Sequence, residues 1–161
     1  MFVKCGVNEE GCRVLCHLPP PIESLALTTT TVIFGGADPK IVGLVPSDIE
    51  IRDNDFDKPL SWKAIHKWSV KNLFELKNAR RVLVDGNRFQ NSWVDSQQGY
   101  AIMLTPRNQN GKAPWSAVED LTFTRNLVTQ CSSGIEYVND TCVCVCVCVC
   151  TGFVFDYICP I

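Results

Sequence analysis

The sequence predicts an all-β fold in which a coil of parallel strands stacks on itself, and three observations support this. The pattern apolar-x-apolar-x-x-Asn-x-apolar occurs over residues 49–56, 82–89 and 121–128. Its asparagines fall at positions 54, 87 and 126, so the spacings are 33 and 39. A second set of short apolar strands alternates with this pattern along the chain. A fixed order of strands with loops of variable length is typical of a stacked repeat.

Each copy of the pattern begins as a strand and ends in a turn. Val82 and Val84 alternate with Leu83 and Asp85, which is the period of a β-strand. Gly86 then predicts a turn, because glycine adopts positive φ at low cost. We expect matching apolar residues of successive copies to stack in a narrow core. The predicted stacks are Ile49/Val82/Leu121, Ile51/Val84/Phe123 and Phe56/Phe89/Val128.

The repeated asparagines have a structural interpretation. If the copies stack, Asn54, Asn87 and Asn126 form a ladder in which each side-chain amide bonds the next. Stacked buried amides satisfy each other's hydrogen bonds. We therefore favour a structural role for these three residues over a role in ligand binding.

The second set of strands covers residues 31–34, 73–76, 101–104 and 134–137. If Phe34, Leu76, Leu104 and Tyr137 correspond, their spacings are 42, 28 and 33. Helical periodicity is weak throughout, although residues 62–72 could make a short helical turn. The prediction is thus a coil with two types of strand joined by irregular loops.

The chain divides into a leader, a repeat region and a tail. Residues 1–30 carry little pattern, residues 31–139 hold the repeat, and residues 140–161 form a low-complexity Cys-Val tail. Ten cysteines are present, but none lies between His17 and Gln130. The repeat region therefore does not depend on disulfides, and the cysteine count does not identify the redox compartment.

The leader and the tail each leave alternatives open. The leader lacks the pattern of a good signal peptide, and Cys5, Cys12, Cys16 and His17 match no standard zinc spacing. The Cys-Val repeat of residues 142–150 is the peptide that a simple TG tract in DNA encodes, which is the favoured origin. Alternatives are soft-metal binding through thiolates, a strand with cysteines on one face, or a membrane helix, for which the run is short. The tail is also an aggregation hazard.

The repeated Ile-x-Ile-x-x-Asn-x-Phe signature with stacked asparagines resembles the right-handed parallel β-helix superfamily, the pectin-lyase-like fold. Residues 46–62, 68–89 and 99–128 are more narrowly similar to uncharacterised bacterial β-helix proteins. The resemblance covers about residues 33–134 and implies a solenoid of about three coils. Those proteins are longer and exported, so this chain would hold only their middle, with open ends that favour self-association.

Enzymes of the fold that the chain resembles place charged residues on an outer sheet face. The resemblance implies Ca²⁺ and an Arg or Lys base for a lyase, and clustered Asp residues for a hydrolase. The candidates are Asp53, Asp55 and Asp85 near one turn and Arg80 and Arg81 near another. None forms a diagnostic motif, and charges on an outer face are usually solvation and edge protection.

Aromatic residues provide a second kind of candidate. The four tryptophans fall in loops or turns, where an aromatic face can stack on a sugar ring. Arg107 lies in the long polar loop of residues 105–117. The alternative is that the tryptophans anchor long loops against the coil, which is the favoured interpretation. The candidates for substrate binding are Trp62, Trp68, Trp93, Trp115 and Arg107.

Three functional hypotheses follow from these residues. The first is a non-catalytic module that binds polysaccharide or is structural, without a cofactor. The second is a fragment of a polysaccharide lyase or glycoside hydrolase, and Ca²⁺ is expected only for the lyase. The third is a truncated product without a selected function. A net charge of −2 argues against a nucleic-acid partner, and we expect no membrane partner.

Overall fold

The computed structural model describes residues 32–35, 41–65, 69–108, 110–137 and 145–148. Short parallel strands dominate these residues, together with one short helix among the described residues, α1 (Ser61–Ile65). The strands are β1 (Val32–Phe34), β2 (Ser47–Arg52), β3 (Asp55–Asp57), β4 (Phe74–Leu76), β5 (Ala79–Asp85), β6 (Arg88–Ser92), β7 (Tyr100–Leu104), β8 (Val118–Thr124), β9 (Leu127–Cys131), β10 (Ser133–Tyr137) and β11 (Val145–Cys148).

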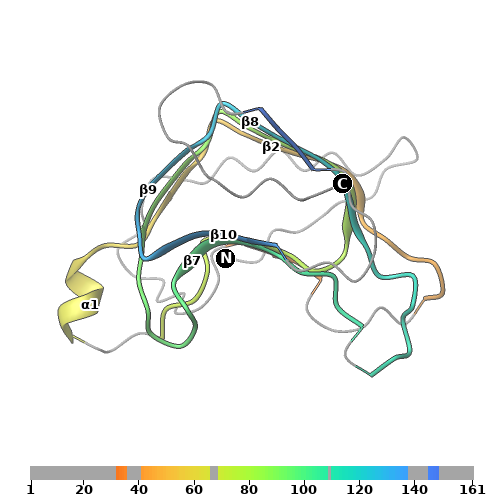
Figure 1. Ribbon diagram of the computed structural model, residues 1–161, viewed down its shortest axis with the longest axis horizontal. Coiled ribbons are helices and arrows are strands. Elements are labelled where there is room, and N and C mark those ends of the chain that lie inside the picture. The colour runs from red at the N-terminus through yellow and green to blue at the C-terminus, as the bar shows by residue number, and fades with distance from the viewer. Residues whose placement is uncertain (1–31, 36–40, 66–68, 109, 138–144, 149–161) are drawn as a thin grey trace.

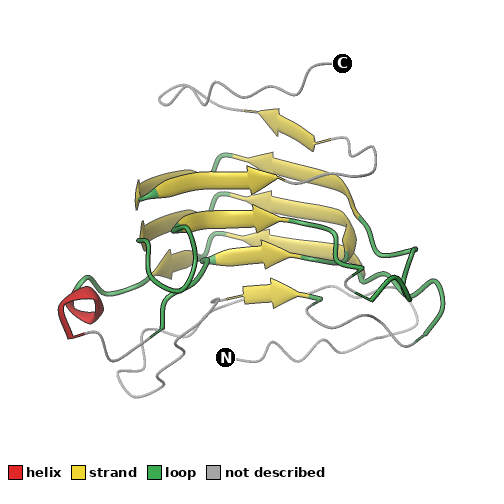
Figure 2. Cartoon of the chain, turned by 60° about the horizontal axis from the view of Figure 1, so that its bottom comes forward, coloured by secondary structure: helices red, strands yellow, loops and turns green. Residues whose placement is uncertain are grey.

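The strands form three sheets that the chain visits in a repeating order. Sheet A has the order β1-β4-β7-β10, sheet B has β11-β8-β5-β2, and sheet C has β3-β6-β9. Every strand pair within these sheets is parallel. Figure 1 shows the sheets as three sides around the core, and Figure 2 shows successive strands lying one above the other. The protein is therefore all-β with parallel sheets, which is compatible with the predicted β-helix.

The register confirms the predicted stacks of apolar residues. Ile49, Val82 and Leu121 are partners across sheet B, and so are Ile51, Val84 and Phe123. Phe56, Phe89 and Val128 are partners across sheet C. The residues expected to correspond in the second set of strands, Phe34, Leu76, Leu104 and Tyr137, are partners across sheet A.

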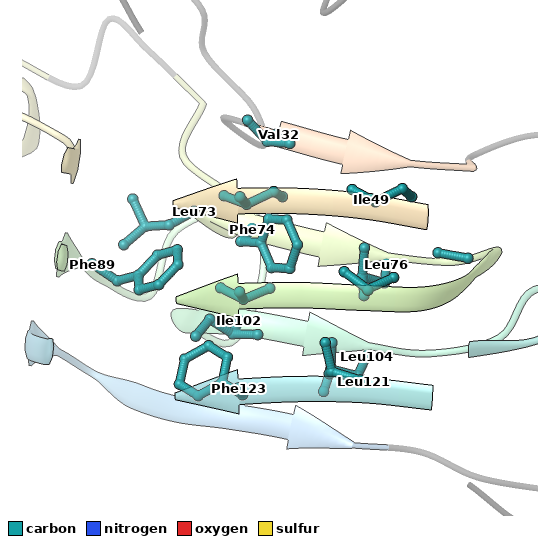
Figure 3. Close-up of a cluster of buried hydrophobic side chains, with 14 of the residues drawn as sticks. Val32, Ile49, Leu73, Phe74, Leu76, Phe89, Ile102, Leu104, Leu121 and Phe123 are labelled. Carbon is teal, nitrogen blue, oxygen red and sulfur yellow. The ribbon is translucent and has the colours of Figure 1, made fainter. Parts of the chain in front are cut away.

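The core lies between the three sheets. Figure 3 shows side chains of all three sheets, among them Phe74, Phe89 and Leu121, in one cluster. The rings of Phe56 and Phe89 stack with centroids 4.6 Å apart, and Phe123 follows at 6.1 Å from Phe89. Burying a phenylalanine contributes about 1.5–3 kcal/mol, so this column holds successive coils together.

The structure refines the prediction in three places. A coil, meaning one pass through sheets A, B and C, has three strands rather than two, because the chain after each ladder asparagine also pairs in parallel, as sheet C. The helical turn expected over residues 62–72 appears as α1 at Ser61–Ile65. In the Cys-Val repeat, β11 pairs with β8 so that Val145 and Val147 align with the inward residues Leu121 and Phe123. The strict alternation of the tail thus fits the period of a strand.

Candidate functional site

The corner between sheets B and C contains the three repeated asparagines. Asn87 Oδ1 accepts hydrogen bonds from the backbone N of Asn54 at 2.9 Å and from its Nδ2 at 3.0 Å. Asn126 Oδ1 accepts the equivalent pair from Asn87 at 2.8 and 3.0 Å. Asn87 Nδ2 also donates to the carbonyl of Ile51 at 2.8 Å. Each rung therefore uses its side chain to join its own coil to a neighbouring one.

The residue before each asparagine has a left-handed backbone. Asp53, Gly86 and Arg125 occupy this position with φ of 52°, 67° and 52°. Only Gly86 adopts this conformation without a steric cost. A Cβ atom added to Gly86 would lie 2.5 Å from Asp53 Oδ1, so the side chain of Asp53 folds over the glycine. The carboxylate of Asp53 is thus held beside the turn of the next coil.

Asp85 is the most heavily bonded of the predicted catalytic residues. Its carboxylate accepts hydrogen bonds from Arg125, from Thr124 Oγ1 at 2.9 Å and from Arg52 Nη1 at 2.8 Å. Arg125 contributes most to lowering the pKa of Asp85 to about 2, and Thr124 and Arg52 act in the same direction. These donors come from the coils before and after Asp85. Asp85 is therefore ionised and enclosed by donors, which suits a structural joint better than a catalytic acid.

Two other predicted catalytic residues form exposed ion pairs between coils. Asp55 binds Arg88 at the start of sheet C. Arg81 binds Asp48 through two hydrogen bonds of 2.6 and 2.7 Å. These bonds lower the pKa of Asp48 and raise the pKa values of Arg81 and Arg88. Both pairs are solvent-exposed, and such pairs add little to stability.

Arg80 and Arg81 share the outer side of sheet B although they are neighbours in sequence. Arg81 has a φ of 50° and is skipped in the pairing of β5 with β2 and β8. Asp48 of β2 and Asp120 of β8 have the same left-handed backbone, so the chain turns at this level in all three coils and the register is kept. Arg81 is exposed, and the Nε of its neighbour Arg80 lies 3.5 Å from Glu119 Oε1. The two arginines lie at the beginning of β5, whereas Asp85 lies at its end. The structure thus separates the predicted bases from the predicted carboxylates.

The candidates for substrate binding lie on separate segments. Trp62 is half-buried on α1, and Trp93 is buried directly after β6. Trp115 and Arg107 are half-buried in the loop of residues 105–117, where the backbone N of Arg107 donates to the carbonyl of Lys77. Trp68 lies outside the described residues. Because Trp93 is buried, the face of its ring is not accessible for stacking on a sugar.

The corner between sheets C and A holds polar residues that the sequence reasoning did not select. Lys58 is 2% exposed, and its Nζ donates to the carbonyls of Lys71 at 2.8 Å and Asn72 at 3.1 Å. Asn91, with a φ of 64°, donates to Asp57 Oδ1 at 2.6 Å. A signal for Lys58 was present, because it follows the inward Phe56 by two residues and therefore shares its face.

A third corner, between sheets A and B, has its own bridging asparagine. Asn78 Nδ2 donates to the carbonyl of Leu44, and Asn78 Oδ1 accepts a bond of 3.2 Å from the backbone N of Ala117. On the outer side of sheet A, Glu75 is buried and lies 2.6 Å from Lys77 Nζ. Asn78 has no repeated counterpart in the pattern that identified the ladder, which is why the sequence did not reveal it.

Within the described part of the chain, no group of three or more His, Cys, Asp or Glu side chains could hold a metal ion. The described residues also contain no helix long and apolar enough to cross a membrane. The cysteines of the leader lie outside the described residues. On the outside of sheets B and C, Arg81, Arg88 and Arg125 each pair with a carboxylate of the preceding coil.

Comparison with known proteins gives no match: none to a family model, none to a curated protein and none to a solved structure.

Proposed function

We propose that the chain is part of a right-handed parallel β-helix of the pectin-lyase-like type. The cyclic order of sheets A, B and C and the in-register parallel pairing support this. The right hand follows from the strong preference of parallel crossover connections for that hand. The asparagine ladder supports the same proposal, because it requires equivalent turns to lie directly above one another.

We further propose that this β-helix is a structural module and not an enzyme. The observation that carries this proposal is the environment of Asp85. Its carboxylate accepts bonds from Arg52, Thr124 and Arg125, so its oxygens already bind side chains of both neighbouring coils. A general acid or base must instead face its substrate with a pKa near the working pH. Asp55 and Arg81 are likewise engaged between coils.

The partner of this module is proposed to be a second copy of the chain, which binds at the end of the stack formed by β9 and β10. Among the described strands, β9 and β10 are the edge strands of sheets C and A at this end, as β1, β2 and β3 are edge strands at the opposite end. The apolar residues of this end, Val128, Ile135 and Tyr137, are only partly buried, and Leu127 is 46% exposed. In the first coil, Phe56 and Val32, which are equivalent to Val128 and Ile135, are buried, whereas Phe34, which is equivalent to Tyr137, is partly buried. An open parallel edge with exposed apolar residues pairs readily with another strand.

Sedimentation velocity over a range of protein concentrations tests this proposal. We expect the chain to associate, and Leu127→Lys to weaken the association by placing a charge at the open end. Val42→Lys is the matched control, because Val42 is 82% exposed in the first coil and should not affect association. A monomer at all concentrations would refute the proposed partner. Equal effects of both substitutions would place the contact elsewhere.

The structural role is tested by a separate assay. The purified chain is incubated with a panel of polyuronates and Ca²⁺, and unsaturated products are followed by their ultraviolet absorbance. We expect no product. Product formation that Arg80→Ala or Arg81→Ala abolishes would contradict the structural role and support a lyase instead.

A further inference from the structure

Lys58 carries a buried amine at the corner between sheets C and A. The alternation of β3 turns Phe56 inward and Asp57 outward, and Lys58 follows on the inward side. Lysine is rarely buried to this degree, since its charge is costly to remove from water. Lys58 is 2% exposed, so its amine needs partners inside the protein.

Those partners belong to the second coil. Lys58 Nζ donates to the carbonyls of Lys71 and Asn72, which Leu73 separates from β4. Lys58 itself directly follows β3 of the first coil. The amine therefore closes the base of the excursion between β3 and β4. It also ties the end of one coil to the beginning of the next.

The charged groups around the amine come from three segments. Asp95, in the turn after β6, acts on Lys58 by its charge, and its Oδ2 accepts a hydrogen bond of 2.5 Å from the backbone N of Val70. Asp57 is exposed and accepts a bond from Asn91. Lys71 is half-buried and adds a second cation in the segment before β4. Asp95 thus places a negative charge near the amine of Lys58, and its bond to Val70 holds the turn after β6 against the segment before β4.

We propose that Lys58 is a proton-sensitive joint between the first two coils, which is firm when the amine is neutral and weakens when the amine binds a proton. A neutral amine keeps two N–H groups, which can donate to the carbonyls of Lys71 and Asn72. The additional proton places a charge in a site from which water is excluded. Asp95 compensates that charge in part.

The direction of the pH dependence follows from burial. Burial lowers the pKa of Lys58 to about 7, and the charge of Asp95 opposes this shift. In the unfolded chain the pKa of a lysine is about 10.4. Between these two values the unfolded state binds the proton and the folded state does not. Stability therefore rises with pH from about 7 to about 10.4, and below pH 7 this contribution is absent.

The first experiment titrates Lys58 directly in the folded full-length chain. Lysines are labelled with ¹³C, and the Cε resonance of Lys58 is assigned by its loss in Lys58→Met. We expect its midpoint near pH 7, whereas exposed lysines titrate near pH 10.4. Asp95→Asn should move the midpoint of Lys58 lower, because it removes the stabilising anion. A midpoint of Lys58 with the other lysines would overturn the proposal.

The second experiment measures whether this proton weakens the fold. Urea unfolding of the unsubstituted chain and of Lys58→Met is compared from pH 6 to pH 9. We expect the midpoint difference between the two proteins to change in favour of the unsubstituted chain as pH rises. Lys63→Met, which removes an exposed lysine of α1, should leave the pH dependence unchanged. A pH-independent difference would show that Lys58 is only a packing residue.

If Lys58→Met does not fold, the pH dependence of the stability of the unsubstituted chain is compared with that of Asp95→Asn. The stability of Asp95→Asn should depend more steeply on pH near neutral pH. Equal dependences would then count against the joint.

Discussion

The corner between sheets B and C and the corner between sheets C and A differ in the length and the residue types of their connections. At the B–C corner, two residues separate the strands in each coil, and the second is always asparagine. At the C–A corner, the connections run from β3 to β4 over residues 58–73 and from β6 to β7 over residues 93–99, while β9 and β10 are separated by Ser132 alone. One corner repeats its chemistry and the other does not.

The difference shows what a stacked repeat requires of its turns. In a two-residue turn, the backbone groups have few partners of their own, so Asn87 satisfies those of the neighbouring coil. An unsatisfied buried group would be costly, which makes the residue type obligatory at each level. A longer connection folds on itself and recruits particular side chains, such as Lys58 and Asp95. The B–C turns therefore keep one length and one residue type, whereas the C–A connections differ in length and sequence from coil to coil.

The largest effect should come from the middle rung of the ladder. Asn87→Ala removes the acceptor of two bonds from Asn54 and the donor to the carbonyl of Ile51. Leaving such buried groups without partners costs about 1–3 kcal/mol each, and we expect a loss of about 3 kcal/mol in the free energy of unfolding. Urea denaturation followed by circular dichroism measures this loss.

Asn91→Gly is the matched substitution at the C–A corner. Asn91 lies near the end of β6, the strand that Asn87 directly precedes, and its Nδ2 donates a hydrogen bond to Asp57 Oδ1. Its φ of 64° suits glycine, so the change should cost much less than Asn87→Ala. Equal losses for the two substitutions would break the distinction between the corners.

Asp85→Asn should have the next largest effect and should change the acid limb of stability. The folded pKa of Asp85 is about 2, below its usual value of 3.8. Its contribution is therefore fully present above pH 3.8 and is lost as pH falls through 2. We expect Asp85→Asn to be less stable at pH 7 and its stability to fall less between pH 4 and pH 2. Parallel pH profiles for the two proteins would show that Asp85 titrates normally.

The sequence predicts the regular parts of the fold, which repeat from coil to coil, better than the irregular parts. The stacks through Val82, Val84 and Phe89 were predictable, because period-2 alternation and a repeated asparagine report on residues that must match between coils. The separate third sheet was not, since strands as short as Asp55–Asp57 carry too few residues to show a period.

The candidate site was less predictable than the fold. The sequence groups Asp53, Asp55 and Asp85 near one turn, but it does not show that Asp85 accepts hydrogen bonds from Arg125 of the next coil. That contact depends on the register and on the positive φ of Arg125, which is a property of the folded turn. Lys58 escaped selection because a lysine beside Pro59 in a loop is ordinarily exposed.

Gly86→Ala should have a smaller effect and sharpens the comparison within the B–C corner itself. Alanine at a φ of 67° is strained, and its Cβ would meet Asp53 Oδ1, although that side chain can move. We expect a loss of about 1 kcal/mol. The reverse change in the adjacent coil, Asp53→Gly, should relieve a φ of 52° and be neutral or stabilising in the same denaturation assay. A stabilising Gly86→Ala would contradict the left-handed turn.

Arg81→Ala should have the smallest effect, although Arg81 makes two short bonds to Asp48. Both side chains are about half exposed, so water and salt screen the pair and the long arginine side chain regains its freedom when the bond is lost. We expect an unfolding midpoint within the scatter of the measurement at 0.15 M salt. Bonds between coils that look alike in geometry thus differ in consequence, because the ladder amides are buried and this arginine is not. If Arg81→Ala destabilised the protein as much as Asn87→Ala does, burial could not be the property that makes the B–C corner repeat.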